Sequence, residues 1–176
     1  ILAIAVAAVN RTPSTRWVAV AFGAPVFVLT ILEAVFPDSD TIQLISYIFH
    51  AIFYFYTAVS LLRYMFADAW VSRDELYATG ACFTVLAWAF AYTHGVVELI
   101  WPGSYIKAGT DGPLTWMDLL FLSFTSLTNT GLSDITPAVD ANHARSVLML
   151  QMLAGLNYIA LVVARLLGLT LLKARR

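Results

Sequence analysis

The chain has 176 residues, of which 60% are hydrophobic and only 12% are charged. Its mean hydropathy is +0.78, and a soluble domain of this length would carry about twice that share of charged residues. The composition excludes an ordinary soluble domain and predicts an integral membrane protein. The net charge of −1 gives no reason to expect nucleic-acid binding. Cys82 has no second cysteine to pair with, so we interpret it as a packing residue.

A helix that spans a membrane needs about 20 mostly apolar residues. Four segments meet that length: residues 17–36, 41–66, 76–101 and 143–172. Pro25 lies inside the first of them and is a candidate kink. We interpret residues 1–9, which are apolar but too short to span, as the end of an earlier helix. Residues 114–128 are also short for a span, and they lead directly into a polar loop. The expected fold class is an all-α membrane protein with four complete spans, a partial N-terminal span and a re-entrant helix before the last span.

The positively charged residues predict the orientation, because Lys and Arg are enriched in cytoplasmic loops. They cluster before the first span, from the end of the second to the start of the third, and at the end of the fourth: Arg11, Arg16, Arg63, Arg73, Arg165, Lys173, Arg175 and Arg176. All of these clusters fall on one side of the membrane. The C-terminus is therefore expected to be cytoplasmic, and residues 104–142 are expected to enter the membrane from the outer face.

The polar loop reads Thr-Asn-Thr-Gly-Leu-Ser-Asp over residues 128–134. Its backbone N–H and C=O groups would have no partners in hydrocarbon, so at membrane depth the loop must line water or be buried in protein. The C-terminal end of the helix before it carries a partial negative charge that favours a cation. Backbone carbonyls after that helix could replace the water of a cation. The pattern indicates an ion pathway, and because one chain supplies one loop, we expect a ring of four copies.

The loop and its flanks resemble the pore domain of bacterial potassium channels. That family has the pattern Thr-Thr-x-Gly-Tyr-Gly-Asp-Ile-x-Pro, then an Ala-Arg step into an inner helix with a central glycine. Gly131, Asp134, Ile135 and Pro137 match the pattern, Ala144-Arg145 and Gly155 fit the inner helix, and the resemblance covers about residues 76–169. It implies a homotetramer in the bacterial inner membrane, with no cofactor and with K⁺ and/or Na⁺ as the permeant ions. The implied ion-conducting filter consists of Thr128, Asn129, Thr130, Gly131, Leu132, Ser133 and Asp134.

Three filter residues depart from the family pattern. Asn129 replaces a threonine, Leu132 replaces an aromatic residue, and Ser133 replaces a glycine. If position 133 requires a positive φ, a serine there would cost on the order of 1–2 kcal/mol of strain per subunit. We therefore expect a passive monovalent cation channel with weak or absent K⁺ selectivity. The alternatives are a K⁺-selective channel with a variant filter and a non-conducting membrane scaffold.

Two filter side chains have two possible roles each. The amide of Asn129 could project into the pore, or it could turn sideways to satisfy the backbone of the neighbouring subunit. The carboxylate of Asp134 could join an outer ring that concentrates cations. The resembling family instead favours a hydrogen bond from this aspartate to the pore helix behind the filter.

The inner helix contains three candidate gating or cavity residues: Gly155, Gln151 and Asn157. Gly155 could be a gating hinge or a site of close helix packing, and the resemblance slightly favours the hinge. Gln151 and Asn157 are polar within an apolar span, so they should face protein or water. We expect one of them to line a cavity and the other to contact a neighbouring helix.

The sequence divides into an N-terminal region, residues 1–75, and a pore domain, residues 76–176. The pore domain would contain an outer helix (76–101), a pore helix (114–128), the filter (128–134) and an inner helix (143–172). Residues 41–66 occupy the place of a voltage sensor but contain only Arg63 as a basic residue, so no strong voltage sensing is expected.

The remaining polar residues give weaker indications. His94 and Glu98 could form half a metal site, although local hydrogen bonds are the better interpretation. His50 is expected to bond to a neighbouring helix, and His143 to lie near the pore mouth. No arrangement of residues indicates an enzyme.

Overall fold

The computed structural model describes residues 13–37, 39–66, 73–109 and 112–174. The described part contains five helices and two short strands: α2 (Pro13–Val35), α3 (Asp40–Met65), α4 (Arg73–Ile100), β1 (Tyr105–Lys107), α5 (Trp116–Leu127), β2 (Ile135–Pro137) and α6 (Asn142–Ala174). The helices begin and end within a few residues of the expected bounds. The partial helix expected at residues 1–9 lies outside the described residues.

Three helical segments are long and apolar enough to cross a membrane: Asp40–Met65, Tyr77–Ile100 and Asn142–Arg165. They confirm an integral membrane protein and three of the expected spans. The first expected span falls in α2, a helix of 23 residues that contains Pro25, and α2 is not among these three segments. A total of four complete spans therefore stays a prediction.

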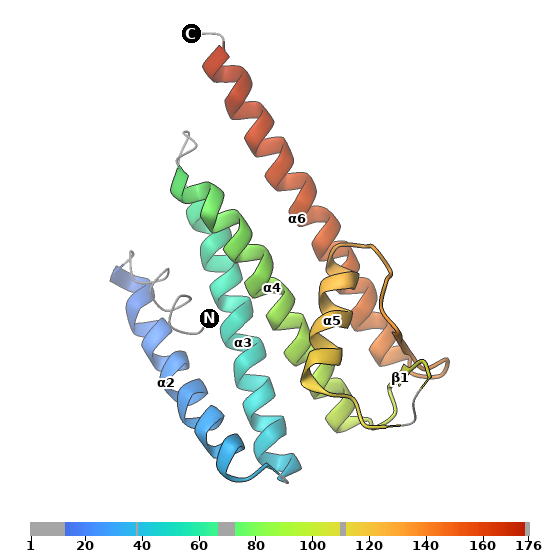
Figure 1. The fold of residues 1–176 in the computed structure, drawn as a ribbon. Coiled ribbons are helices and arrows are strands. Elements are labelled where there is room, and N and C mark those ends of the chain that lie inside the picture. The colour runs from blue at the N-terminus through green and yellow to red at the C-terminus, as the bar shows by residue number, and fades with distance from the viewer. Residues whose placement is uncertain (1–12, 38, 67–72, 110–111, 175–176) are drawn as a thin grey trace.

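The helices α2, α3 and α4 lie side by side, whereas α6 leans away from them toward the C-terminus (Figure 1). The apolar core lies mainly between α3 and α4 and includes Phe53, Tyr54 and Phe90. Cys82 is fully buried there, and its thiol lies 3.5 Å from the carbonyl oxygen of Ala58. This contact confirms Cys82 as a packing residue.

The short helix α5 packs between the second half of α4 and the first half of α6 (Figure 1). Aromatic rings anchor its first turn, since the ring centroids of Trp116 and Tyr92 are 4.2 Å apart. The ring of Trp116 also lies 5.7 Å from that of Trp88, a second residue of α4. These contacts hold the start of α5 against α4.

The two strands form a small antiparallel sheet that the helical pattern of the sequence did not predict. Tyr105 pairs with Pro137, Ile106 with Thr136, and Lys107 with Ile135. β1 precedes α5 and β2 follows the polar loop, so the pairing brings the two ends of the intervening segment together. The segment therefore enters and leaves on the same side of the helical layer.

Candidate functional site

The start of α5 is fixed by a capping box and an ion pair. The hydroxyl oxygen of Thr115 accepts from the backbone N–H of Asp118, and the Asp118 carboxylate accepts from the backbone N–H of Thr115 at 2.8 Å. Lys107 of β1 lies 2.7 Å from the same carboxylate. The ammonium of Lys107, followed by the Thr115 N–H, lowers the pKa of Asp118, and the hydrogen bond to Asp118 raises the pKa of Lys107.

The end of α5 is a Schellman motif built around Asn129. The Asn129 N–H donates to the carbonyl of Ser126 and the Thr130 N–H donates to that of Thr125, both at 3.0 Å. Asn129 has a φ of +56°, the left-handed conformation that this motif requires at the residue after the cap. Asparagine tolerates that conformation better than other non-glycine residues.

This geometry corrects the location of the expected backbone strain. Ser133 does not have a positive φ, whereas Asn129 and Gly131 do, at +56° and +65°. The hydroxyl oxygen of Ser133 instead accepts from the backbone N–H of Ile135 at 3.0 Å, a local turn contact. The condition for strain at Ser133 is therefore not met, and the non-glycine residue of the loop with a positive φ is Asn129.

The threonine hydroxyls of the loop also bond to the end of α5. Thr128 Oγ1 donates to the carbonyl of Phe124 at 2.8 Å, and Thr130 Oγ1 donates to that of Thr125 at 3.2 Å. These bonds and the Schellman motif satisfy carbonyls that a helix end leaves without partners. The residues that follow α5 are therefore held by the helix itself.

The loop is open on its other side. Thr128 to Leu132 are all exposed, and 75% of Leu132 is accessible. After Ser133 the chain returns to the sheet, where Ala108 N–H donates to the carbonyl of Asp134 at 2.8 Å. Asp134 is exposed. The resemblance instead implied that its carboxylate would bond to the pore helix behind the loop.

Contacts with α6 set the depth of the loop. Gly155 packs against the backbone of Leu127, the last residue of α5, and a Cβ atom at Gly155 would lie 2.8 Å from the Leu127 carbonyl carbon. At about 1.5 Å per residue, α6 runs about 20 Å from Asn142 to Gly155. The end of α5 therefore packs near the middle of the apolar segment Asn142–Arg165 of α6, and the chain then returns to the sheet.

The side chain of Asn129 also turns toward α6. Its Nδ2 donates to the carbonyl of Met152 at 3.2 Å. The amide therefore contacts a backbone group of its own chain, and both expected roles stay predictions.

The structure separates the three inner-helix candidates. Gln151 is fully buried and bonds to His94 of α4 and Ser123 of α5, so it is the inter-helix contact. Asn157 is exposed, and its Nδ2 donates to the carbonyl of Leu153 in its own helix. Gly155 has a packing role in this structure, which supports that interpretation over a hinge.

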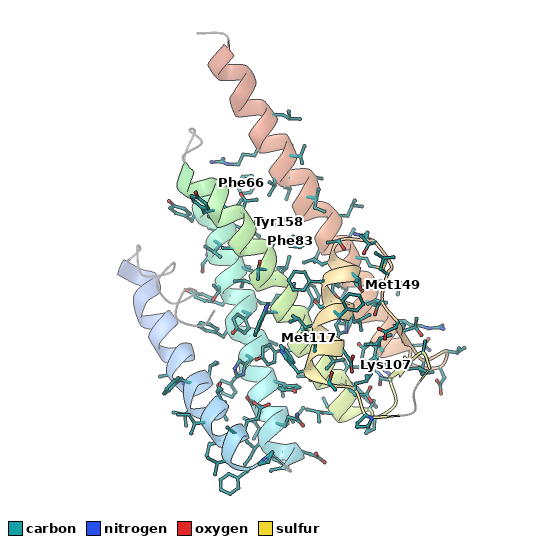
Figure 2. All side chains as sticks on the ribbon, viewed as in Figure 1. Phe66, Phe83, Lys107, Met117, Met149 and Tyr158 are labelled. Atoms are coloured by element: carbon teal, nitrogen blue, oxygen red, sulfur yellow. The ribbon has the colours of Figure 1, made fainter. Side chains whose placement is uncertain are left out.

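Farther along α6, the packing against α4 continues through aromatic contacts. Tyr158 and Phe83 face each other across the two helices with ring centroids 5.7 Å apart (Figure 2). The Tyr158 hydroxyl also bonds to the carbonyl of Thr79. This second contact region lies in the part of α6 that follows Gly155, away from the loop.

The other polar candidates are local contacts. Glu98 accepts from the backbone N–H groups of Gly103 at 2.7 Å and Tyr105 at 3.1 Å, and His94 bonds to the Tyr105 hydroxyl at 2.6 Å. Both side chains therefore make the hydrogen bonds that the sequence interpretation favoured. Within the residues that the structure describes, no group of three or more His, Cys, Asp or Glu side chains could hold a metal ion.

The two remaining histidines also have partners in the fold. His50 lies within 3.3 Å of Thr30 on α2, which confirms its contact with a neighbouring helix. His143 lies 2.8 Å from the Ser104 hydroxyl and packs on the ring of Trp101. It therefore joins the start of α6 to the chain that leaves α4.

Sequence reasoning missed the Schellman motif and the role of Gln151 as a link between helices. The first had a usable signal, because an asparagine directly after an apolar helix is a common left-handed cap. The second had none, since only the packing of α4, α5 and α6 determines which polar side chains meet.

Comparison with known proteins identifies the part of the chain that contains the site. The sequence model of a family described as an ion channel matches residues 80–170, more than half of the chain. The match begins in α4, includes α5 and the loop, and ends in α6. No curated protein and no solved structure matches the chain. The chain belongs to this ion channel family, and residues 80–170 are its channel domain.

Proposed function

We propose that the protein is a passive monovalent cation channel, assembled as a homotetramer, in which residues 128–134 line the ion pathway. The observation that carries the proposal is an exposed, non-helical loop that follows α5 and lies beside the middle of the apolar helix α6. Backbone groups in such a loop need water or protein partners. A ring of loops from several copies would provide both, with each loop facing a shared aqueous pore.

The surface of α6 supports assembly. Leucine and methionine side chains are exposed along the part of α6 that faces away from α4 and α5, including Met149 (62% exposed) and Leu156 (60% exposed). These apolar residues could be covered by lipid, but the polar backbone of the loop beside them could not. Packing of α6 helices around a common axis would place the loops next to one another.

The electrostatics favour a cation. The C-terminal end of α5 carries the negative end of its dipole and lies directly before the loop. Asp134 adds an exposed carboxylate at the other end of the loop. Lys107 interacts electrostatically with Asp134, but it is already paired with Asp118. A cation in the loop region would meet oxygen atoms and a net negative potential.

We further propose that selectivity for K⁺ is weak or absent. The basis is the identity of Asn129, Leu132 and Ser133, which depart from the potassium-channel pattern. Asn129 ends α5 and contacts Met152, so it does not contribute a threonine hydroxyl to an ion site. Leu132 is exposed and has no hydroxyl to brace the loop.

The test is current recording from the purified protein in planar bilayers with K⁺ on one side and Na⁺ on the other. We expect cation currents that reverse near zero voltage. Each tenfold preference shifts the reversal by about 59 mV, so a shift of that size or more toward the K⁺ potential would show a selective pore. Absence of any current would remove the proposal of conduction, and a native mass other than that of four chains would remove the tetramer.

A further inference from the structure

A continuous chain of buried hydrogen bonds lies behind the loop and connects β1, α4, α5 and α6. Its members are Tyr105, His94, Gln151 and Ser123, and each is at least 96% buried. The histidine lies 2.6 Å from the Tyr105 hydroxyl and 2.6 Å from the Gln151 side-chain oxygen. The Gln151 nitrogen then reaches the carbonyl and the hydroxyl of Ser123, at 2.9 Å and 2.6 Å.

The donors and acceptors in this chain can be assigned without ambiguity. The Ser123 carbonyl can only accept, so the Gln151 atom facing it must be the NH₂ group. The Gln151 oxygen then accepts, so His94 must have its proton on Nε2. A neutral ring with that proton has a bare Nδ1, which accepts from the Tyr105 hydroxyl. Burial of an unpaired charge is costly, which favours the neutral ring.

The chain closes on α4. The single proton of the Ser123 hydroxyl donates to the carbonyl of Ala87 at 2.6 Å, so its oxygen is free to accept from Gln151. Ala87 and His94 are two helical turns apart on α4 and lie on the same face. Every buried side-chain nitrogen and oxygen in the described part of the chain has a partner. A fully satisfied buried network rigidifies the elements that it joins.

The network reaches both sides of the loop. Ser123 lies one turn before the end of α5, which leads into the loop, and Tyr105 pairs with Pro137 of β2, which leads out of it. Gln151 lies one turn before Gly155, which packs against Leu127. Rotation or sliding of α5 would therefore break bonds at Gln151 and move the loop with it.

We propose that His94, Gln151 and Ser123 are positioning residues for the loop at residues 128–134. Their hydrogen bonds hold α5 at one depth and one rotation between α4 and α6, and thereby set which cations the pore admits. The effect of the network on ion permeation rests on the proposed function, whereas its effect on the mobility of the loop does not.

The experiment compares Gln151→Leu and Ser123→Ala with the matched control Tyr158→Phe. The control removes an inter-helix hydrogen bond between α6 and Thr79 of α4, in the contact region that lies away from the loop. The K⁺/Na⁺ permeability ratio is measured from reversal potentials, and hydrogen exchange of the loop is measured by mass spectrometry in lipid nanodiscs. Ser123→Ala keeps the experiment interpretable if Gln151→Leu does not fold.

We expect both network variants to change the permeability ratio by about threefold or more, as loss of a buried hydrogen bond allows, and to speed exchange at residues 128–134. Tyr158→Phe should change neither. The effect of the double variant His94→Phe/Gln151→Leu relative to wild type should be smaller than the product of the effects of His94→Phe and Gln151→Leu alone, because the pair acts as a unit.

Two results would overturn the proposal. One is an unchanged permeability ratio in both network variants with normal currents, and the other is equal loop exchange in Ser123→Ala and Tyr158→Phe. If the wild-type protein carries no current, the proposed function fails and the exchange measurement alone decides. Faster loop exchange in Ser123→Ala than in the control then supports positioning.

Discussion

Asn129 adopts a left-handed backbone with φ +56° at the junction of α5 and the loop. The resemblance to potassium channels places a threonine at this position, and a threonine is β-branched and poorly suited to positive φ. The substitution that would restore the family pattern is therefore expected to conflict with the Schellman motif. The left-handed backbone at position 129 therefore favours asparagine over threonine.

We predict that Asn129→Thr lowers the free energy of unfolding by about 1–2 kcal/mol per subunit, the cost of a strained backbone. Asn129→Gly should stay within about 1 kcal/mol of wild type, because glycine adopts positive φ freely. Thermal unfolding in nanodiscs measures both. Equal stability of the two variants would show that the left-handed conformation is not required.

Gly155 and Gly80 offer a matched pair of helix glycines. A Cβ atom at Gly155 would collide with the backbone of Leu127, whereas one at Gly80 would meet nothing within 4 Å. Gly155→Ala should destabilise the protein by about 1–3 kcal/mol through overpacking. Gly80→Ala should stabilise it by about 0.5–1 kcal/mol, because alanine favours a helix.

The same pair distinguishes packing from hinging at Gly155. Unfolding in urea or by heat gives the two changes in stability, and current recordings give any change in gating. A Gly155→Ala variant of normal stability whose open probability changes strongly would favour the hinge and contradict the packing role.

At the level of single residues, the sequence indicated the polar segment and the central glycine of the inner helix but not their contacts. Gly131 and Gly155 stand out because glycine is rare at such positions without a backbone or packing reason. The partners of Gln151 and Asn129 depend on how three helices pack. No local pattern in the chain contains that information.

Among the elements, α5 depends most on its first turn. It has 12 residues, a length at which isolated helices are marginal in water, so its caps matter. Thr115 and Asp118 form the capping box, and Lys107 ties that box to β1 (Figure 2, which labels Lys107). Loss of the box should loosen the helix that leads to the loop.

We predict that Thr115→Ala lowers stability by about 1 kcal/mol, and that Asp118→Asn lowers it in a pH-dependent way. The pKa of Asp118 is below its ordinary value of 3.8 in the fold. Its contribution is therefore present above about pH 4 and is lost as pH falls through the lowered pKa. Thermal midpoints of wild type and Asp118→Asn should differ at pH 7 and converge at low pH, and a constant difference would contradict the ion pair.

The resemblance to potassium channels puts α3 at the position of a voltage sensor, and Arg63 is the basic residue in its sequence. Arg63 lies in its last turn and is exposed. One charge moved through 100 mV gives only about 2.3 kcal/mol, and Arg63 lies at the end of the span. We predict a nearly flat conductance between −100 and +100 mV, about the physiological range of membrane potential, in wild type and in Arg63→Gln. A steep rise that Arg63→Gln abolishes would refute this.

The helices were predictable as elements because length and hydropathy suffice to recognise a span. α4 and α6 begin and end close to the expected residues. The β1–β2 pair was not predictable, since each strand has three residues and pairs with a partner far along the chain. Such pairing depends on the return of the loop rather than on a local alternation of side chains.

In the molecule as a whole, the single chain leaves its inner helix mostly uncovered. Only 22% of the apolar window in Asn142–Arg165 is buried within the chain. An exposed apolar helix suits lipid, but the exposed loop beside it needs water or protein. Assembly around the loop would satisfy both surfaces, which supports the proposed channel of several copies.

The position of the loop in the ion pathway can be tested most directly by modifying a single cysteine within it. Leu132 is 75% exposed in the loop, Met117 is 66% exposed in the first turn of α5, and the native Cys82 is buried. The measurement is bilayer current before and after a positively charged thiol reagent, in Leu132→Cys and in the control Met117→Cys (Figure 2 labels Met117). A cationic group fixed in the pathway should repel permeant cations. We predict loss of most of the current in Leu132→Cys and little change in Met117→Cys; unchanged current in fully modified Leu132→Cys would contradict a pore lined by this loop.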